Sequence, residues 1–162
     1  MTNTLPKVKI KRRGRFLIPF GIAVTVLGFI IFLVGAEPSL FGLDRSPVIG
    51  FVQITVFLIG LGLICLGGYI SLAALWNGGP KSIVSDIGQR LVGTGYMIAV
   101  ASGLADLFGI GSQQYPRIPR FGEWQVLGVL AGQVIIAIGF LMLIPYAKPA
   151  TKLPEPPYIE ND

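Results

Sequence analysis

Three long apolar runs constrain the fold of this chain more than any other feature. They cover residues 16–35, about 49–76 and about 124–146, and they are nearly free of charged side chains. An apolar helix of about 20 residues spans the hydrocarbon core of a bilayer, where each backbone polar group must be hydrogen-bonded within the helix. The runs therefore predict three transmembrane helices.

A fourth membrane span is predicted over residues 83–108, although this segment is less apolar. It contains Asp86, Arg90 and Asp106. Asp86 and Arg90 are four residues apart, so they can pair on one helical face near the inner surface, with Arg90 reaching toward the headgroups. The apolar stretch that follows, residues 91–105, can complete the span.

The composition agrees with an integral membrane protein. Charged residues make up 13% of the chain and the mean hydropathy is +0.72, whereas soluble domains carry about 25% charged residues. Six of the thirteen Lys and Arg residues stand in the basic tail, residues 1–15. A polybasic segment before an apolar helix is a topology signal and contacts anionic lipid headgroups, so we expect no nucleic-acid partner.

The distribution of cations predicts the orientation. The N-terminal tail, the segment around Lys81 and the C-terminal tail carry most of the Lys and Arg residues, and the two opposite loops hold fewer. Positive charge is enriched on the cytoplasmic side, so both termini are expected there, in a multi-pass plasma-membrane protein. The Pro-rich tail, residues 147–162, is expected to be extended and disordered.

An internal duplication is the most informative pattern in the chain. The motif R-x-P-x-x-G-x-x-Q-x6-G-x6-G occurs twice, 72 residues apart. Upstream glycines and a Leu-Phe-Gly triplet match at an offset of 67 residues. The chain is therefore predicted to contain two tandem helical hairpins, over residues 16–76 and 77–146. A repeat of two spans keeps the same orientation in each copy, which predicts a pseudo-twofold axis along the membrane normal.

Glycine spacing predicts how the helices pack. Small residues recur every seven positions on each span, and small residues let helix backbones approach closely in a membrane, where van der Waals contact drives association. A G-x-x-x-G pair on the last span could pack inside the bundle or against another protein; we favour the bundle because every span has its own small stripe. The predicted packing positions are Gly21, Gly28, Gly60, Gly67, Gly88, Gly95, Gly128, Gly132 and Gly139.

Five polar positions are candidates for function. Gln53 and Gln125 are expected to face each other or equivalent neighbours near the outer end of the bundle and share hydrogen bonds, or else to bind a ligand. Arg45 and Arg117 precede helix-entry prolines and are expected to bind headgroups, cap the outer turn or dock a partner. Asp106 is expected to pair with an arginine of the following loop, or else to act on protons or cations.

The residues that most enzymes need are missing. The chain has no histidine and one cysteine, and its carboxylates are not clustered. We therefore expect no metal site, cofactor or catalytic activity, and haem ligation through histidine is excluded. The sequence favours a structural or accessory membrane protein that packs with itself or a larger complex through Gly-lined faces. The alternative is a small oligomeric transporter or channel with a polar path near Gln53, Gln125 and Asp106.

Overall fold

The computed structural model describes residues 13–42, 50–76, 81–105 and 122–145, with side chains from residue 16 onward. Within these ranges the chain is helical, as predicted. Four long helices and one short 3-10 helix follow in the order α1 (Arg13–Ala36), η1 (Pro38–Phe41), α2 (Phe51–Leu75), α3 (Ile83–Gly103) and α4 (Glu123–Leu143).

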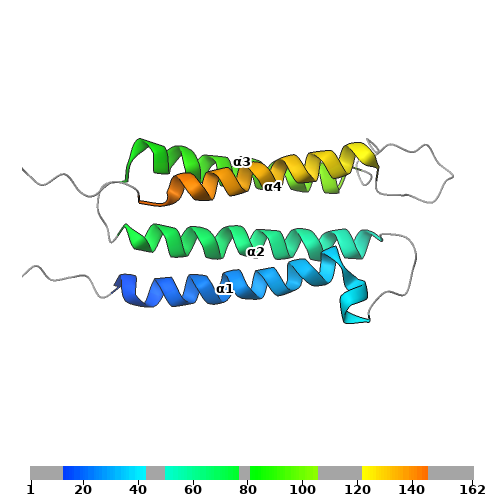
Figure 1. The fold of residues 1–162 in the computed structure, drawn as a ribbon, viewed down its shortest axis with the longest axis horizontal. Coiled ribbons are helices and arrows are strands. Elements are labelled where there is room, and N and C mark those ends of the chain that lie inside the picture. The colour runs from blue at the N-terminus through cyan, green and yellow to red at the C-terminus, as the bar shows by residue number, and fades with distance from the viewer. Residues whose placement is uncertain (1–12, 43–49, 77–80, 106–121, 146–162) are drawn as a thin grey trace, which may run out of the picture.

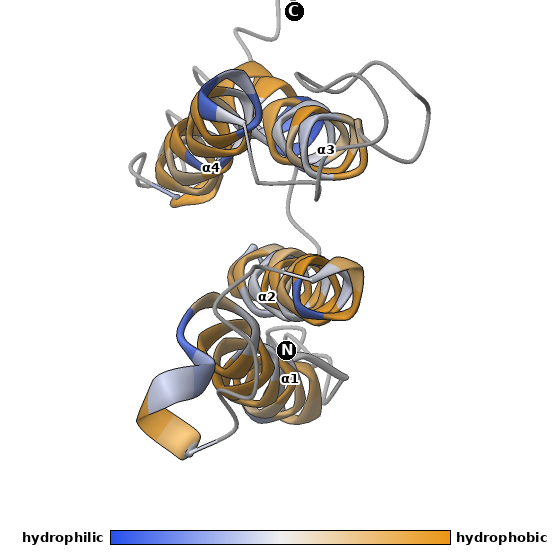
Figure 2. Ribbon diagram, turned by 90° about the vertical axis from the view of Figure 1, so that its right-hand side faces the viewer, coloured by the Kyte–Doolittle hydropathy of each residue, from blue (hydrophilic) through white to orange (hydrophobic). Residues whose placement is uncertain are grey.

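The four long helices lie side by side and form two close pairs (Figure 1). The view along the helices shows α1 beside α2, and α3 beside α4 (Figure 2). Contacts between the pairs are sparser and come from α2, which packs against both α3 and α4. Each pair is therefore an antiparallel helical hairpin, and α2 is the element that joins one hairpin to the other.

Three of the long helices, α1, α2 and α4, have the length and composition needed to cross a membrane. α3 is not one of them, because its first half carries Asp86, Gln89 and Arg90. Over the described residues the chain is thus all-helical with three membrane-spanning candidates, and the crossing of α3 remains a prediction.

The helix ends differ from the predicted boundaries by a few residues. α2 and α4 begin one residue after Gly50 and Gly122, which both have extended backbone conformations. α4 ends at Leu143 rather than at 146, because Ile144 precedes Pro145 and a residue before proline avoids the helical conformation. Ile144 accordingly has a ψ of 131°. α3 ends at Gly103 rather than 108, and the predicted remainder from residue 106 lies outside the described residues.

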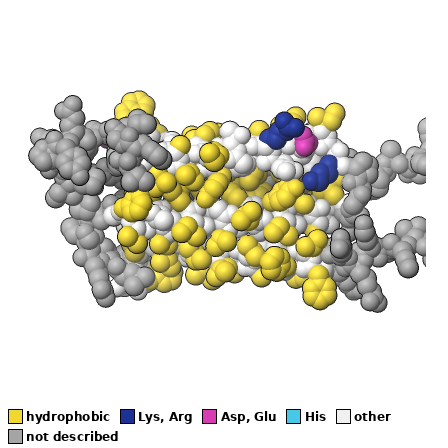
Figure 3. Space-filling model, turned by 180° about the vertical axis from the view of Figure 1, so that it is seen from behind, with side chains coloured by type: hydrophobic (Ala, Val, Ile, Leu, Met, Phe, Trp, Pro, Cys, Tyr) yellow, Lys and Arg dark blue, Asp and Glu magenta, His cyan; other side chains and the backbone are white. Residues whose placement is uncertain are grey.

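The surface of the bundle is largely apolar. Large hydrophobic side chains are exposed along every long helix, such as Phe29 on α1 and Leu130 on α4. Figure 3 shows them covering the middle of one face, while the Lys, Arg and acidic side chains visible there gather near one end. The buried core is a small cluster that includes Leu58, Val92 and Ile136. Lipid tails are as apolar as these exposed side chains, so this surface suits a bilayer.

Candidate functional site

The first hairpin is held together by backbone contact at glycines. A Cβ atom added to Gly60 would lie 2.9 Å from the carbonyl oxygen of Gly28. A Cβ atom added to Gly67 would lie 2.6 Å from the carbonyl oxygen of Gly21. Carbon and oxygen do not approach so closely without a clash, so no side chain fits between α1 and α2 at either level.

The second hairpin repeats this arrangement at the matching positions. A Cβ atom added to Gly132 would lie 2.5 Å from the carbonyl oxygen of Gly95, and one added to Gly139 would lie 2.8 Å from that of Gly88. The G-x-x-x-G pair faces inward as well, because a Cβ atom on Gly128 would meet the Ser102 side chain of α3. All the glycines predicted to mediate packing therefore lie at contacts inside a hairpin.

The two glutamines predicted to bond to each other take different roles. The side-chain oxygen of Gln125 accepts a hydrogen bond of 2.7 Å from the backbone N–H of Gly122, which satisfies one free donor at the start of α4. Gln125 is 4% exposed, and its Nε2 atom has no hydrogen-bond partner. No hydrogen bond joins it to Gln53, because the Gln125 side chain folds back onto its own helix end.

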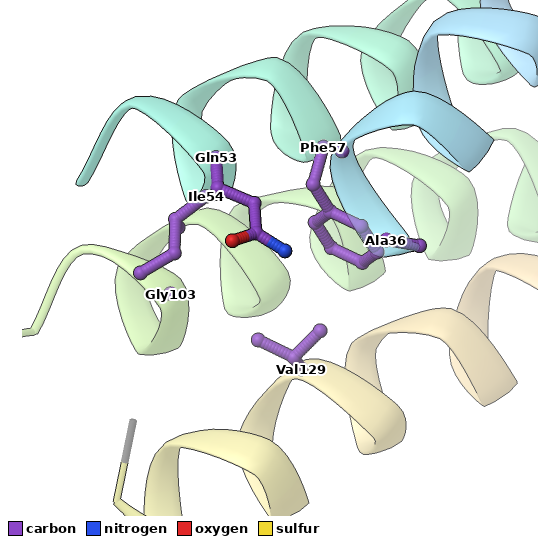
Figure 4. Close-up of a pocket in the computed structure, with 7 residues that line it drawn as sticks. Ala36, Gln53, Ile54, Phe57, Gly103 and Val129 are labelled. Atoms are coloured by element: carbon purple, nitrogen blue, oxygen red, sulfur yellow. The ribbon is translucent and has the colours of Figure 1, made fainter. Parts of the chain in front are cut away.

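Gln53 lines a cavity of about 180 Å³ at the end of the bundle where α1 ends and α2 begins. Figure 4 shows its amide group between the side chains of Ile54, Phe57 and Val129. All four long helices contribute to the wall, which apart from Gln53 is apolar. The lining residues are Gly35, Ala36, Gln53, Ile54, Phe57, Gly103 and Val129.

A larger groove of about 340 Å³ separates α2 from α3. Tyr69 lies in its wall, and its hydroxyl group is 3.4 Å from the ammonium of Lys81, which also lies 5.4 Å from the centre of the Tyr69 ring. The lining residues are Gly62, Cys65, Leu66, Tyr69, Gln89, Val92, Gly93 and Tyr96.

Charged side chains mark the two ends of the bundle. Glu37 and Glu123 follow α1 and begin α4 at the end that holds the Gln53 cavity. Lys81 stands at the other end, where α3 begins. Asp86 and Arg90 form the predicted ion pair, with 3.2 Å between Asp86 Oδ2 and Arg90 Nε. Both side chains of this pair are exposed, so the pair contributes little to stability.

The other predicted polar sites lie outside the described residues. These are Asp106, Arg45 and Arg117, and the same holds for the Pro-rich tail and most of the basic N-terminal tail. Among the side chains that the structure does describe, no three His, Cys, Asp or Glu residues come close enough to hold a metal ion.

The α2–α3 groove was not predicted from the sequence. Gly62 and Gly93 lie outside the seven-residue glycine stripes, so the periodicity did not single them out. A usable signal was present in α3, where Gln89, Gly93 and Thr94 stand among apolar residues and add to the polar character given by Asp86 and Arg90.

No protein-family model, curated protein or solved structure that was compared with the chain matches it.

Replacing Gln125 with alanine should destabilise the protein by about 1 kcal/mol, the usual net value of one hydrogen bond. The substitution leaves the Gly122 N–H without its acceptor at the start of α4. Equilibrium unfolding in detergent micelles measures this difference. Gln125→Glu keeps an acceptor oxygen at the same place but buries a carboxyl group, so recovery of part of the loss would support the capping role. Unchanged stability of the Gln125→Ala protein would contradict it.

Proposed function

We propose that the chain is a non-enzymatic membrane protein of structural or accessory type, made of two tandem hairpins in the same orientation. In this proposal it crosses the plasma membrane four times, keeps both termini in the cytoplasm, and associates with itself or with a larger membrane complex. The sequence repeat and the matching glycine contacts support the tandem arrangement, and the cation distribution supports the orientation.

The contacts within the hairpins support a common origin in detail. Gly60 packs against Gly28 and the backbone of Phe32, and Gly132 packs against Gly95 and the backbone of Ala99. Each residue of the second group follows its counterpart by 67 or 72 positions, the two offsets of the sequence repeat. Two unrelated hairpins would have no reason to meet at equivalent residues.

The packing of α3 supports its crossing of the membrane. α3 touches α4 at Gly88, again at Gly95, and again at Ser102. Gly88 and Ser102 are 14 positions apart, which is about 21 Å along the helix at 1.5 Å per residue. Because α4 is apolar enough to span a bilayer, most of α3 lies at the same depth.

Exposed polar side chains on α3 are the observation that supports the proposed association with another protein surface. Four residues of α3 are exposed on the outside of the bundle, and we call them the α3 outer face: Asp86, Arg90, Thr94 and Met97. The side chains of Asp86 and Arg90 are 57% and 79% exposed. Polar side chains are unfavourable against lipid tails and usually face protein or water inside membranes. A second protein surface on α3 would remove these groups from lipid, and the predicted packing glycines are already used within the hairpins.

The second candidate function is a small oligomeric transporter or channel. The observation in its favour is the Gln53 cavity, where the Gln53 amide lies among apolar side chains. On α4, one turn before the lining residue Val129, the Nε2 atom of Gln125 is buried without a hydrogen-bond partner. Asp106 would complete the polar path in this proposal. Because the described wall is otherwise apolar, the accessory role has the stronger support.

The association is tested by replacing Thr94 with the photo-crosslinking amino acid p-benzoylphenylalanine. The matched control is the same replacement at Leu27, which precedes Thr94 by 67 residues in the repeat and is 53% exposed on α1. We expect illumination of native membranes to give a covalent protein adduct from position 94 and none from position 27.

The identity of the crosslinked molecule distinguishes the accessory role from the transporter or channel. An adduct with another membrane protein supports the accessory role. A dimer of this chain supports association with itself through α3, and if native mass spectrometry then finds no other partner, a flux assay with the reconstituted protein tests the transporter alternative. Lipid adducts alone at both positions would contradict the association through α3.

A further inference from the structure

The groove between α2 and α3 has an apolar interior with unused space. Cys65, Leu66 and Val92 form its walls, and the groove holds about 340 Å³. Gly93 lines the groove, and a Cβ atom added to it would meet no atom outside its own stretch of helix backbone within 4 Å, so there is open space beside this glycine. Small-molecule sites commonly have volumes of about 300–1,000 Å³.

The rim of the groove carries a cation and two polar side chains. Tyr69 and Gln89 line the groove, and the Lys81 ammonium lies 3.4 Å from the Tyr69 hydroxyl oxygen. The charge of the neighbouring Arg90 is paired with Asp86. Among the described side chains, the ammonium of Lys81 has the phenol and ring of Tyr69 as its partners, and no carboxylate.

We propose that the α2–α3 groove binds one anionic glycerophospholipid. An acyl chain lies along the apolar interior past Cys65 and Val92, and the phosphate meets Lys81 and the hydroxyl of Tyr69 at the rim. The cation makes an anionic headgroup the complementary choice, since lysine and arginine near the cytoplasmic surface attract anionic lipid. The groove is distinct from the α3 outer face, so this site does not depend on the proposed association.

Other occupants fit the groove less well. A partner's transmembrane helix would lay apolar side chains along the groove and would leave the Lys81 ammonium at the rim without an anionic partner. A zwitterionic lipid would place a second cation beside Lys81, where the described structure offers no carboxylate to receive it. A phospholipid that places one of its acyl chains in the groove and an anionic headgroup at the rim matches both the shape and the charge.

The test uses the full-length protein stripped of lipid in detergent, with lipid binding followed by native mass spectrometry. The probes are dioleoyl phosphatidylglycerol and dioleoyl phosphatidylcholine, which share acyl chains and differ in charge. We expect the wild type to bind one phosphatidylglycerol more tightly than phosphatidylcholine. Lys81→Gln should weaken phosphatidylglycerol binding about fivefold, the usual effect of one lysine near an anionic headgroup, and leave phosphatidylcholine binding unchanged.

The matched control is Arg90→Gln, which removes a neighbouring cation that is paired and lies outside the groove lining. It should leave phosphatidylglycerol binding unchanged. Equal losses for Lys81→Gln and Arg90→Gln would overturn the site, because they would show general attraction to charge. Gly93→Leu fills the groove without meeting another atom at its Cβ and should weaken binding of both lipids. Unchanged binding in a Gly93→Leu protein with native stability would also overturn the proposal.

Discussion

Replacing Gly132 with alanine is expected to destabilise the protein by about 1–3 kcal/mol, the usual cost of overfilling a packed interior. The added Cβ atom would lie 2.5 Å from the Gly95 carbonyl oxygen and 2.8 Å from the backbone nitrogen of Ala99. Backbone atoms cannot move aside as a flexible side chain can, so α3 and α4 would have to separate. Unfolding of the purified protein by increasing mole fraction of dodecyl sulfate in mixed micelles measures the loss.

Replacing Gly93 with alanine should not lower the stability of the protein, in contrast to the same substitution at Gly132. A Cβ atom there meets nothing within 4 Å, and alanine favours a helix over glycine by about 1 kcal/mol. Gly93→Ala is therefore expected to be neutral or stabilising, although both glycines lie in the same hairpin. A loss of stability at Gly93 equal to that at Gly132 would mean that backbone contact is not what makes Gly132 necessary.

The equivalent glycine of the first hairpin allows a second comparison of the effect of alanine. Gly60 is the counterpart of Gly132, and its added Cβ atom would lie 2.9 Å from the Gly28 carbonyl oxygen and meet the backbone of Phe32. We expect Gly60→Ala to destabilise the first hairpin by a similar amount. A large effect in one hairpin and none in the other would argue against equivalent packing.

The glycine contacts could be predicted from the sequence because they depend on spacing along a helix. A seven-residue stripe keeps one face of a helix toward its neighbour, and in an antiparallel pair two such stripes meet at every second turn. Gly21 accordingly meets Gly67, and Gly28 meets Gly60, at the levels that the period implies. The starts of α2 and α4, 72 residues apart, follow the same repeat.

Features that depend on how the two hairpins sit against each other could not be predicted in this way. Neither the Gln53 cavity nor the α2–α3 groove follows from a period, because the repeat does not determine which helix of one hairpin faces the other. Gln53 and Gln125 show how this arrangement gives equivalent residues different surroundings. They are equivalent in sequence, yet Gln53 lines a cavity between the hairpins while Gln125 caps its own helix.

Cysteine labelling from one side of the membrane is expected to trace the path of the chain through the bilayer. Single cysteines at Glu37, Lys81 and Glu123 are introduced into a Cys65→Ser background, and intact cells are treated with a membrane-impermeant maleimide. All three native side chains are exposed. We expect labelling at positions 37 and 123 without permeabilisation, and at position 81 only after the membrane is opened.

Labelling at position 123 shows whether the chain crosses the membrane three or four times. Glu37 follows α1 and Lys81 follows α2, so their labelling should differ whether or not α3 crosses the membrane. If α3 crosses, Glu123 emerges on the side of Glu37. If α3 lies along the surface instead, Glu123 remains on the side of Lys81, and the pseudo-twofold arrangement of the two hairpins within the bilayer is excluded. The two flanking cysteines therefore serve as internal standards, and the accessibility of position 123 shows whether α3, with its exposed polar side chains, spans the membrane beside α4.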